Sequence, residues 1–200
     1  GAATSTASPV IRGIGILGGT STNAYKNKIY GITTLATGAT TLVSGITISA
    51  GTTNTVYNNL IGDLNASAAT NTDAIRGINI TSTTTSSTNN IYYNTVNISG
   101  SGGTNFGSSG IFHTASATAT TATLNLRNNI IVNNTTPNGT GLAVAYRRSS
   151  AAAGTLANYA ATSNNNDFYA GTPSATNLIY SDGTNNVQTI AAYKAGVFTA

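Results

Sequence analysis

The sequence contains no cysteine, methionine, tryptophan or glutamate, and only 6% of its 200 residues are charged. Without cysteine the fold has no disulfide bonds, so its stability must come from backbone hydrogen bonding and packing. One histidine and four aspartates, with no thiolate and no second imidazole, do not suggest a metal centre. The eight basic residues are scattered along the chain rather than clustered with aromatic residues, so nucleic acid is not an expected partner.

Long apolar runs and proline are also scarce. No apolar stretch approaches the roughly 18 residues of a membrane-spanning helix, and no basic-then-apolar signal segment opens the chain. Because the sequence begins at Gly1 rather than methionine, we expect a mature product or an excised piece. Disordered chains are usually rich in proline and glutamate, whereas this one has 3 prolines and regularly spaced β-branched residues. We therefore expect a folded protein.

What the sequence does have is a repeat marked by glycine. Five glycines each open a short apolar segment, namely Gly13 (GIGIL), Gly45 (GITIS), Gly77 (GINIT), Gly110 (GIFHT) and Gly141 (GLAVAY). The intervals between them are 32, 32, 33 and 31 residues. A nearly constant period on strand-like segments indicates a stacked β architecture. We interpret the glycines as turn residues, placed where a side chain would obstruct the stack.

The other half of each repeat begins with asparagine and alternates apolar with polar residues, as a strand does. The clearest copies are NKIYG (27–31), NTVYNNLIG (54–62), NNIYYNTVNIS (89–99) and NLRNNIIVNN (125–134). A propeller blade would require about 40–45 residues, and a leucine-rich repeat would require intervening helices or strand-helix units that are not visible. The sequence therefore predicts an all-β fold, a right-handed parallel β-helix (β-solenoid) with about five coils of roughly 32 residues.

We expect a single β-helix domain over residues 1–200. Residues 1–24 would form an N-terminal strand or cap, residues 25–155 regular coils, and residues 156–200 degenerate C-terminal coils. Neither end shows an obvious polar cap, and uncapped solenoid ends expose unpaired backbone groups. This motivates the hypothesis that copies of the chain stack end to end into a filament.

Asparagine, with 26 copies, recurs in a pattern that suits stacking. Asn59, Asn94, Asn129 and Asn166 follow one another at intervals of 35, 35 and 37 residues. In a parallel β-helix, equivalent residues of successive coils lie about 4.8 Å apart, so aligned amide side chains can hydrogen bond along the stack. We predict that these four residues form a structural asparagine ladder.

Catalysis would depend on His113 and the four aspartates. His113 is predicted to be structural or merely exposed, because it has no second histidine or cysteine with which to form a site. Asp63, Asp73, Asp167 and Asp182 do not recur at the repeat period, and we expect them to serve turns. The alternative is a polysaccharide lyase or hydrolase, which needs convergent carboxylates or a carboxylate beside Arg or Lys. We predict no catalytic, cofactor-binding or metal-binding residues and no cofactor.

Two features keep a glycan- or ice-binding module open as an alternative function. The tract TATTAT (118–123) resembles the regular threonine array of an ice-binding face, but it does not recur at the repeat period, and TSTTTSST (81–88) looks like a loop. Tyr57, Tyr92 and Tyr93 could form an aromatic strip on which sugars stack. Packing in the core or at an edge is the commoner use of such tyrosines.

Several segments resemble a known repeat family. They are NKIYGI, VYNNLIGDL, YYNTV and LRNNIIVNNTTPNGTGLAVAYRRSS, followed by SNNNDFYAGTPSATNLIYSDGT and IAAYKA. The family occurs in very large secreted surface proteins of Bacteroidetes-type bacteria. The resemblance implies a parallel β-helix of the pectate-lyase-like superfamily and export to the cell surface or beyond, commonly by the type IX pathway. It brings no catalytic motif. We therefore predict an extracellular structural or adhesive solenoid whose partners are further copies of itself or cell-surface glycans, and no enzyme.

Overall fold

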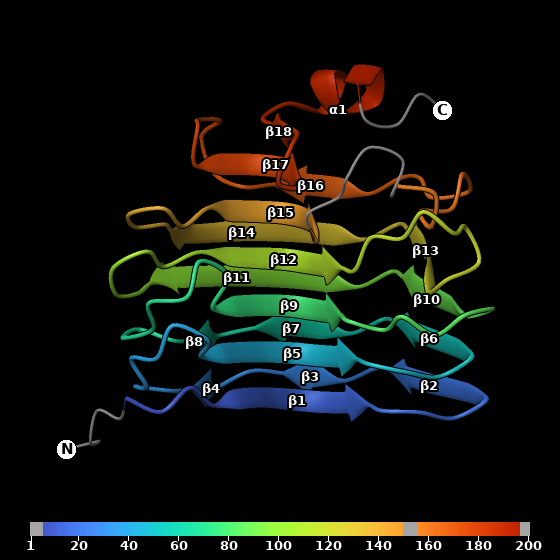
Figure 1. The fold of residues 1–200 in the computed structure, drawn as a ribbon, viewed down its shortest axis with the longest axis horizontal. Helices are drawn as coiled ribbons and strands as arrows, with labels where there is room; N and C mark the ends of the chain where they lie inside the picture. The colour runs from blue at the N-terminus through green and yellow to red at the C-terminus, as the bar shows by residue number, and fades with distance from the viewer. Residues whose placement is uncertain (1–5, 150–155, 197–200) are drawn as a thin grey trace.

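The computed structural model describes residues 6–149 and 156–196. It shows a parallel β-solenoid of about five turns, with equivalent positions about 34 residues apart. Figure 1 shows the strands stacked in rows, from the N-terminal coil in blue to the C-terminal coil in red. The predicted all-β solenoid is therefore confirmed.

The turns of the solenoid build three long sheets, which we call sheets A, B and C. Sheet A has seven strands in the order β1 (Val10–Ile16), β5 (Leu42–Ile48), β9 (Ile75–Ile80), β12 (Ser108–His113), β15 (Ala143–Arg148), β17 (Asn177–Ser181) and β18 (Asn186–Val187). Sheet B has four strands in the order β13 (Thr123–Arg127), β10 (Thr88–Tyr92), β6 (Thr53–Tyr57) and β2 (Ser21–Tyr25). Sheet C has five strands in the order β16 (Asp167–Tyr169), β14 (Ile130–Thr136), β11 (Thr95–Ser101), β7 (Leu60–Gly62) and β3 (Lys28–Ile29).

A small fourth sheet pairs β4 (Ile32–Thr33) with β8 (Leu64–Asn65). The pairings within all four sheets are parallel, except that β18 runs antiparallel to β17. Because parallel pairing joins each coil to the next, every coil hydrogen bonds to its neighbours along the solenoid axis.

The first and last coils continue the sheets that the predicted regular region forms. β1 and most of β2 lie in residues 1–24, and they pair in register with β5 and β6. At the other end, β16 and β17 extend sheets C and A. Beyond β13, the described residues contribute to sheet B only two isolated bridges, to Tyr159 and Asn164. Residues 150–155, at the end of the predicted regular coils, lie outside the described residues.

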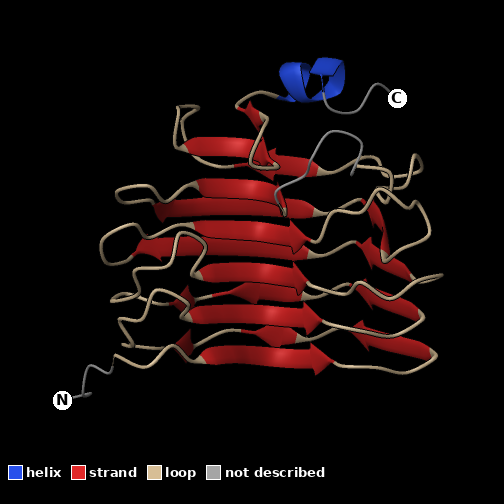
Figure 2. Cartoon of the chain, viewed as in Figure 1, coloured by secondary structure: helices blue, strands red, loops and turns tan. Residues whose placement is uncertain are grey.

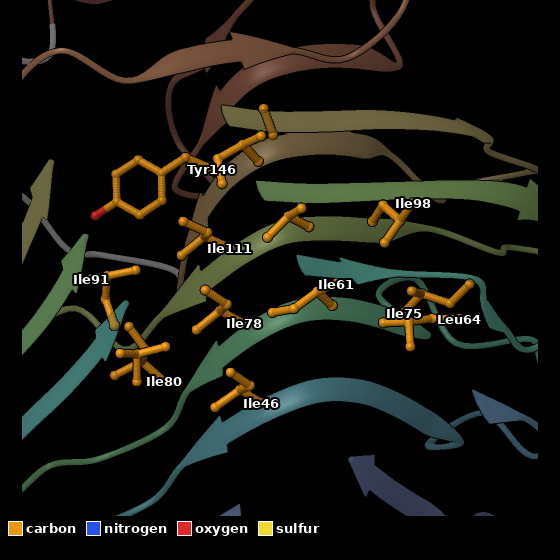
Figure 3. Close-up of a cluster of buried hydrophobic side chains, with 14 of the residues drawn as sticks. Ile46, Ile61, Leu64, Ile75, Ile78, Ile80, Ile91, Ile98, Ile111 and Tyr146 are labelled. Carbon is orange, nitrogen blue, oxygen red and sulfur yellow. The ribbon is translucent and has the colours of Figure 1, made fainter. Parts of the chain in front are cut away.

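The core consists of columns of apolar side chains that run along the solenoid axis. In sheet A one column contains Ile46, Ile78 and Ile111, and all three are fully buried (Figure 3). Sheet B contributes Val56, Ile91 and Leu126, and sheet C contributes Ile61, Val96 and Ile131. β-Branched side chains suit such columns because they pack well on a pleated surface.

Four of the five repeat glycines lie inside strands of sheet A, so their interpretation as turn residues is wrong. Their φ angles are not positive. A Cβ atom on Gly77 would overlap a methyl group of Val96 and would lie 2.5 Å from the carbonyl oxygen of Gly110. The same crowding occurs at Gly13, Gly45 and Gly110, which face Ile29, Ile61 and Ile131. Glycine is therefore required where the apolar column of sheet C meets the backbone of sheet A, as the obstruction argument predicts.

Gly141 is not a member of this column. The register pairs Ser109 with Val144 and Ile111 with Tyr146, so Ala145 stands opposite Gly110. Gly141 precedes β15 and lies against the backbone of Phe106 instead. The last interval of the column is therefore 35 residues (145 − 110) rather than 31. The predicted period of roughly 32 residues is too short because the later coils contain longer loops.

A short helix, α1 (Ile190–Gly196), lies over the last coil and was not expected from the sequence (Figure 2). The hydroxyl of Thr189 accepts a hydrogen bond from the backbone N–H of Ala192, which caps the first turn. Tyr193 is buried among the aromatic side chains of the last coil, at 5.5 Å from the ring of Tyr180 and 5.8 Å from that of Phe168. The sequence shows no obvious polar cap at either end, and in the structure α1 covers the C-terminal coil through aromatic contacts instead. Among the described residues, no helix has the length and apolar character needed to cross a membrane.

Candidate functional site

The four predicted ladder asparagines lie in one column at the corner between sheets B and C. Oδ1 of Asn94 accepts hydrogen bonds from the backbone N–H (3.1 Å) and from Nδ2 (2.9 Å) of Asn59. The same two bonds join Asn94 to Asn129, and Asn129 to Asn166. Asn27 makes them to Asn59, so the ladder has a fifth member that the sequence reasoning missed. Its signal was present, because NKIYG begins with this residue.

The ladder stabilises a sharp corner of the chain. The residue before each ladder asparagine has a left-handed backbone, with φ between 53° and 56°: Lys26, Asn58, Tyr93, Asn128 and Asn165. Nδ2 of Asn94 also donates to the carbonyl oxygen of Val56 at 2.9 Å. Asn59, Asn94 and Asn129 are buried. The amides therefore satisfy backbone groups that the turn removes from regular β pairing. This is a structural column, and it leaves no free group for a ligand in its buried part.

The predicted turn aspartates occupy separate elements. Asp63 lies between β7 and β8 with φ 49°, and Asp167 is exposed on β16. Asp182 follows β17, where its Oδ1 accepts the backbone N–H groups of Thr184 and Asn185. These bonds to backbone and side chains outweigh burial and lower its pKa. Asp63 and Asp182 lie outside the strands, as turn roles require, whereas Asp167 lies within β16, so its predicted turn role is wrong.

Asp73 differs, because two arginines flank its carboxylate on the outer face of sheet A. Nε of Arg76 lies 2.7 Å from Oδ2, and Nε of Arg147 lies 3.6 Å from Oδ1. The hydroxyl of Ser109 donates to Oδ1 at 2.5 Å, and the guanidinium of Arg76 stacks on Phe112 at 3.6 Å from the ring centre. A carboxylate beside arginine is one element of the enzyme alternative. Here the contacts join the carboxylate to its neighbours and cover it, since only 5% of Asp73 is exposed.

His113 is fully buried at the end of β12, where it follows Ile80 in its column and precedes the buried Arg148. Its Nε2 lies 2.9 Å from the carbonyl oxygen of Ala122 and 3.3 Å from Nδ2 of Asn158. Burial, together with the neighbouring Arg148, lowers the pKa of His113 to about 3. The imidazole is therefore neutral. No group of three or more potential metal-ligating His, Cys, Asp or Glu residues occurs within residues 6–149 and 156–196.

The outer face of sheet B carries a pattern that recurs in each of its strands. The segments STNAY (21–25), TNTVY (53–57), TNNIY (88–92) and TLNLR (123–127) align residue for residue. The fourth residue of each points inward and is buried, whereas the first, third and fifth are exposed or half-buried. Three outward columns result: Ser21, Thr53, Thr88 and Thr123; Asn23, Thr55, Asn90 and Asn125; and Tyr25, Tyr57, Tyr92 and Arg127.

We call this outward pattern the sheet B face. The sequence analysis did not predict it, because the outward residues alternate with inward ones and form no unbroken threonine tract. The tracts TATTAT and TSTTTSST contribute one strand residue each, Thr123 and Thr88, while their other residues lie in loops. The detectable signal was a hydroxyl residue, an amide or hydroxyl two positions later and tyrosine two positions after that, at intervals of 32 and 35 residues. A fourth copy follows 35 residues later and has Arg127 in place of the tyrosine. Tyr57 and Tyr92 of the predicted aromatic strip belong to the face. Tyr93 lies at the corner beside it.

The two halves of the sheet B face differ in their internal contacts. On β10 and β13, the Tyr92 hydroxyl donates to Oδ1 of Asn90 at 2.7 Å, and Nδ2 of Asn125 donates to the Tyr92 hydroxyl. Nε of Arg127 donates to Oδ1 of Asn125 at 2.9 Å. On β2 and β6 the rings of Tyr25 and Tyr57 stack at 4.9 Å between centres and 7° between planes.

Comparisons of this chain with models of protein families, with curated proteins and with solved structures find no match.

Proposed function

We propose that the chain is a stiff structural element of an extracellular bacterial surface protein, of the kind that the sequence resemblance to secreted Bacteroidetes proteins implies. The observation that carries this proposal is the five-membered asparagine ladder, which joins successive coils through hydrogen bonds that are buried or partly buried. A solenoid held by ladders and stacked apolar columns does not depend on disulfides. With 6% charged residues, it also depends little on ion pairs that salt would screen.

Immunogold labelling of intact cells of the source organism tests the proposed location. We expect antibodies against the 200-residue chain to label the cell surface, and a brief protease treatment of intact cells to leave the coils undigested. Labelling that appears only after the cells are opened would overturn the proposal. A cytoplasmic marker in the same preparation verifies that the cells are intact.

End-to-end association of copies, predicted from the sequence, has a specific structural requirement. The first coil of one copy would have to stack on the last coil of the next, where α1 lies and where Tyr193 packs among aromatic side chains. We propose that such stacking proceeds only if α1 moves aside. Electron microscopy and sedimentation velocity of the full chain should then show filaments at high concentration, and more of them after residues 189–200 are removed. A monodisperse monomer in both preparations would contradict the filament.

We further propose that the chain is not an enzyme, because the Asp73 carboxylate is occupied by Arg76 and Ser109. Incubation with acidic and neutral polysaccharides, followed by measurement of new reducing ends and of unsaturated products, tests this. Turnover that is lost in Asp73→Asn would support the lyase or hydrolase alternative instead.

A further inference from the structure

The sheet B face has a regularity that stacking alone does not require. Its outward columns repeat hydroxyl, amide or hydroxyl, and tyrosine along the axis. The outward columns of sheet C, built on the same coils, do not repeat: one of them contains Lys28, Leu60, Thr95, Ile130 and Asp167. Outward residues have no part in the core, so the coil geometry leaves them free to differ. A repeated surface pattern on one sheet therefore indicates a ligand with a repeating structure.

We propose that the N-terminal half of the sheet B face, on β2 and β6, binds an uncharged, hydroxyl-rich polysaccharide. This inference adds a binding partner to the structural role proposed above, and it rests on that role only for the extracellular setting in which polysaccharides are met. The ligand chain contacts the rows of Ser21 and Thr53, of Asn23 and Thr55, and of Tyr25 and Tyr57.

The polar side chains of this half have unused hydrogen-bonding capacity. Within the described part of the chain, the side-chain oxygen and nitrogen atoms of six outward residues make no hydrogen bond to protein: Ser21, Asn23, Tyr25, Thr53, Thr55 and Tyr57. Hydroxyl and amide groups both donate and accept hydrogen bonds, which matches the hydroxyl groups of sugars. The C-terminal half is different, because Tyr92, Asn90, Asn125 and Arg127 bond to one another.

The tyrosines of this half are held in place before a ligand arrives. The rings of Tyr25 and Tyr57 stack against each other. Tyr25 is 48% exposed and Tyr57 is half-buried, so both keep surface that a ligand can reach. Tyrosine offers a large contact area with little rotational freedom to lose on binding. The sheet below them is rigid, so binding orders few groups and retains more of its contact energy.

The charge of the surface favours a neutral polysaccharide over nucleic acid. None of the six outward residues of β2 and β6 is charged. Nucleic acid requires several lysine or arginine contacts to its phosphates. Repeated sites along one axis additionally strengthen binding to a repeating polymer, because a second contact forms at high effective concentration.

Co-sedimentation of the intact 200-residue chain with insoluble cellulose and with insoluble chitin tests the inference. We expect retention on at least one of these polymers, largely unchanged by added salt. The double variant Tyr25→Ala/Tyr57→Ala should lose about tenfold in affinity, as expected when roughly 1.4 kcal/mol of contact energy is removed. The matched control is Tyr30→Ala, because Tyr30 is 61% exposed but lies outside the sheet B face. It should bind as the parent chain does.

A second variant keeps the test valid if the loss of both tyrosines disturbs folding. Thr53→Ala combined with Thr55→Val removes two outward hydroxyls without changing a core position, and it should also weaken binding while circular dichroism stays unchanged. Absence of retention on every polymer, equal loss in Tyr30→Ala, or ice recrystallisation inhibition without polysaccharide binding would each overturn the inference. Surface labelling and protease resistance of the chain would be unaffected by these outcomes, so the structural proposal can fail or stand separately.

Discussion

Removing one amide from the middle of the asparagine ladder is the most direct test of what holds the coils together. In Asn94→Ala, the buried backbone N–H of Asn59 loses its acceptor, and Nδ2 of Asn59 loses one of its two bonds. The carbonyl oxygen of Val56 loses a donor as well. A buried polar group left without a partner costs about 1–3 kcal/mol. With two donors affected, we expect the free energy of unfolding to fall by about 2–5 kcal/mol.

Position in the ladder sets the size of this effect. Asn27→Ala removes only the bond from Nδ2 of Asn27 to Oδ1 of Asn59 and keeps the bond from the backbone N–H of residue 27 to the same oxygen. It should therefore lower the free energy of unfolding by less than about 1 kcal/mol. The matched control is Asn97→Ala, because Asn97 lies on β11 only three residues from Asn94 but is exposed. A surface substitution of this kind changes stability by about 0.5 kcal/mol or less.

Urea unfolding followed by far-UV circular dichroism gives the midpoint and slope for all three variants. Their order should be Asn97→Ala, Asn27→Ala and Asn94→Ala, from least to most destabilised. Because stacked repeats can lose cooperativity, the slopes must agree before free energies are compared. If Asn94→Ala unfolds within about 0.5 kcal/mol of Asn97→Ala, the ladder is not what stabilises the corners.

Three further changes test the glycine column, the buried histidine and the strained corner. Gly77→Ala should destabilise the chain by about 1–3 kcal/mol, because the new Cβ meets Val96 and the carbonyl oxygen of Gly110. Gly18→Ala is the control and should be nearly neutral in the same urea assay, because a Cβ at Gly18 meets nothing within 4 Å. The pKa of His113 is about 3 in the folded state against an ordinary value of 6.5, so the unfolded chain binds the proton first as pH falls. The neutral imidazole therefore leaves the folded state at full stability above pH 6.5, and the folded state loses stability as pH falls from 6.5 toward 3. Stability should therefore drop by up to about 1.4 kcal/mol per pH unit in that window, and an NMR titration that shows His113 protonating near pH 6.5 in the folded state would refute this. Tyr93→Asn should raise the free energy of unfolding by about 0.5–1 kcal/mol, measured by thermal unfolding. Tyr93 is 59% exposed and has φ 55°, a left-handed backbone at which the next coils have asparagine. A loss of stability would show that the tyrosine side chain holds the corner.

The sequence was sufficient for the features that the coil repeats without exception. The spacing of Asn59, Asn94, Asn129 and Asn166 follows directly from the stack, because each must lie above the last to share its amide. The glycine column could be followed only through Gly110. In the next coil Ala145 takes the position. Gly141, which lies four residues earlier, preserved the apparent period.

Other features depend on contacts that no local pattern reveals. α1 spans seven residues, too few to display a helical period, and its place is fixed by Tyr193 among distant aromatic rings. Asp73 meets Arg147 only because parallel pairing brings β15 within reach of the turn before β9, two coils away. The burial of His113 likewise follows from its place in the column of Ile80, not from its neighbours in the chain.

The sheet B face shows how one period can serve two purposes. The inward residues of β2 and β6 must stack in a narrow core, so Ala24 and Val56 are constrained by volume. The outward residues are exposed or half-buried and have no part in the core, yet Tyr25 and Tyr57 repeat in register and stack face to face. Stability gives a partial reason for this pair, since stacked rings contribute about 0.5–1.5 kcal/mol. It gives none for the hydroxyls and amides beside them, which make no bond within the described residues. A bound ligand would give these hydroxyls and amides hydrogen-bond partners. Their removal by substitution should therefore change ligand binding without changing the free energy of unfolding.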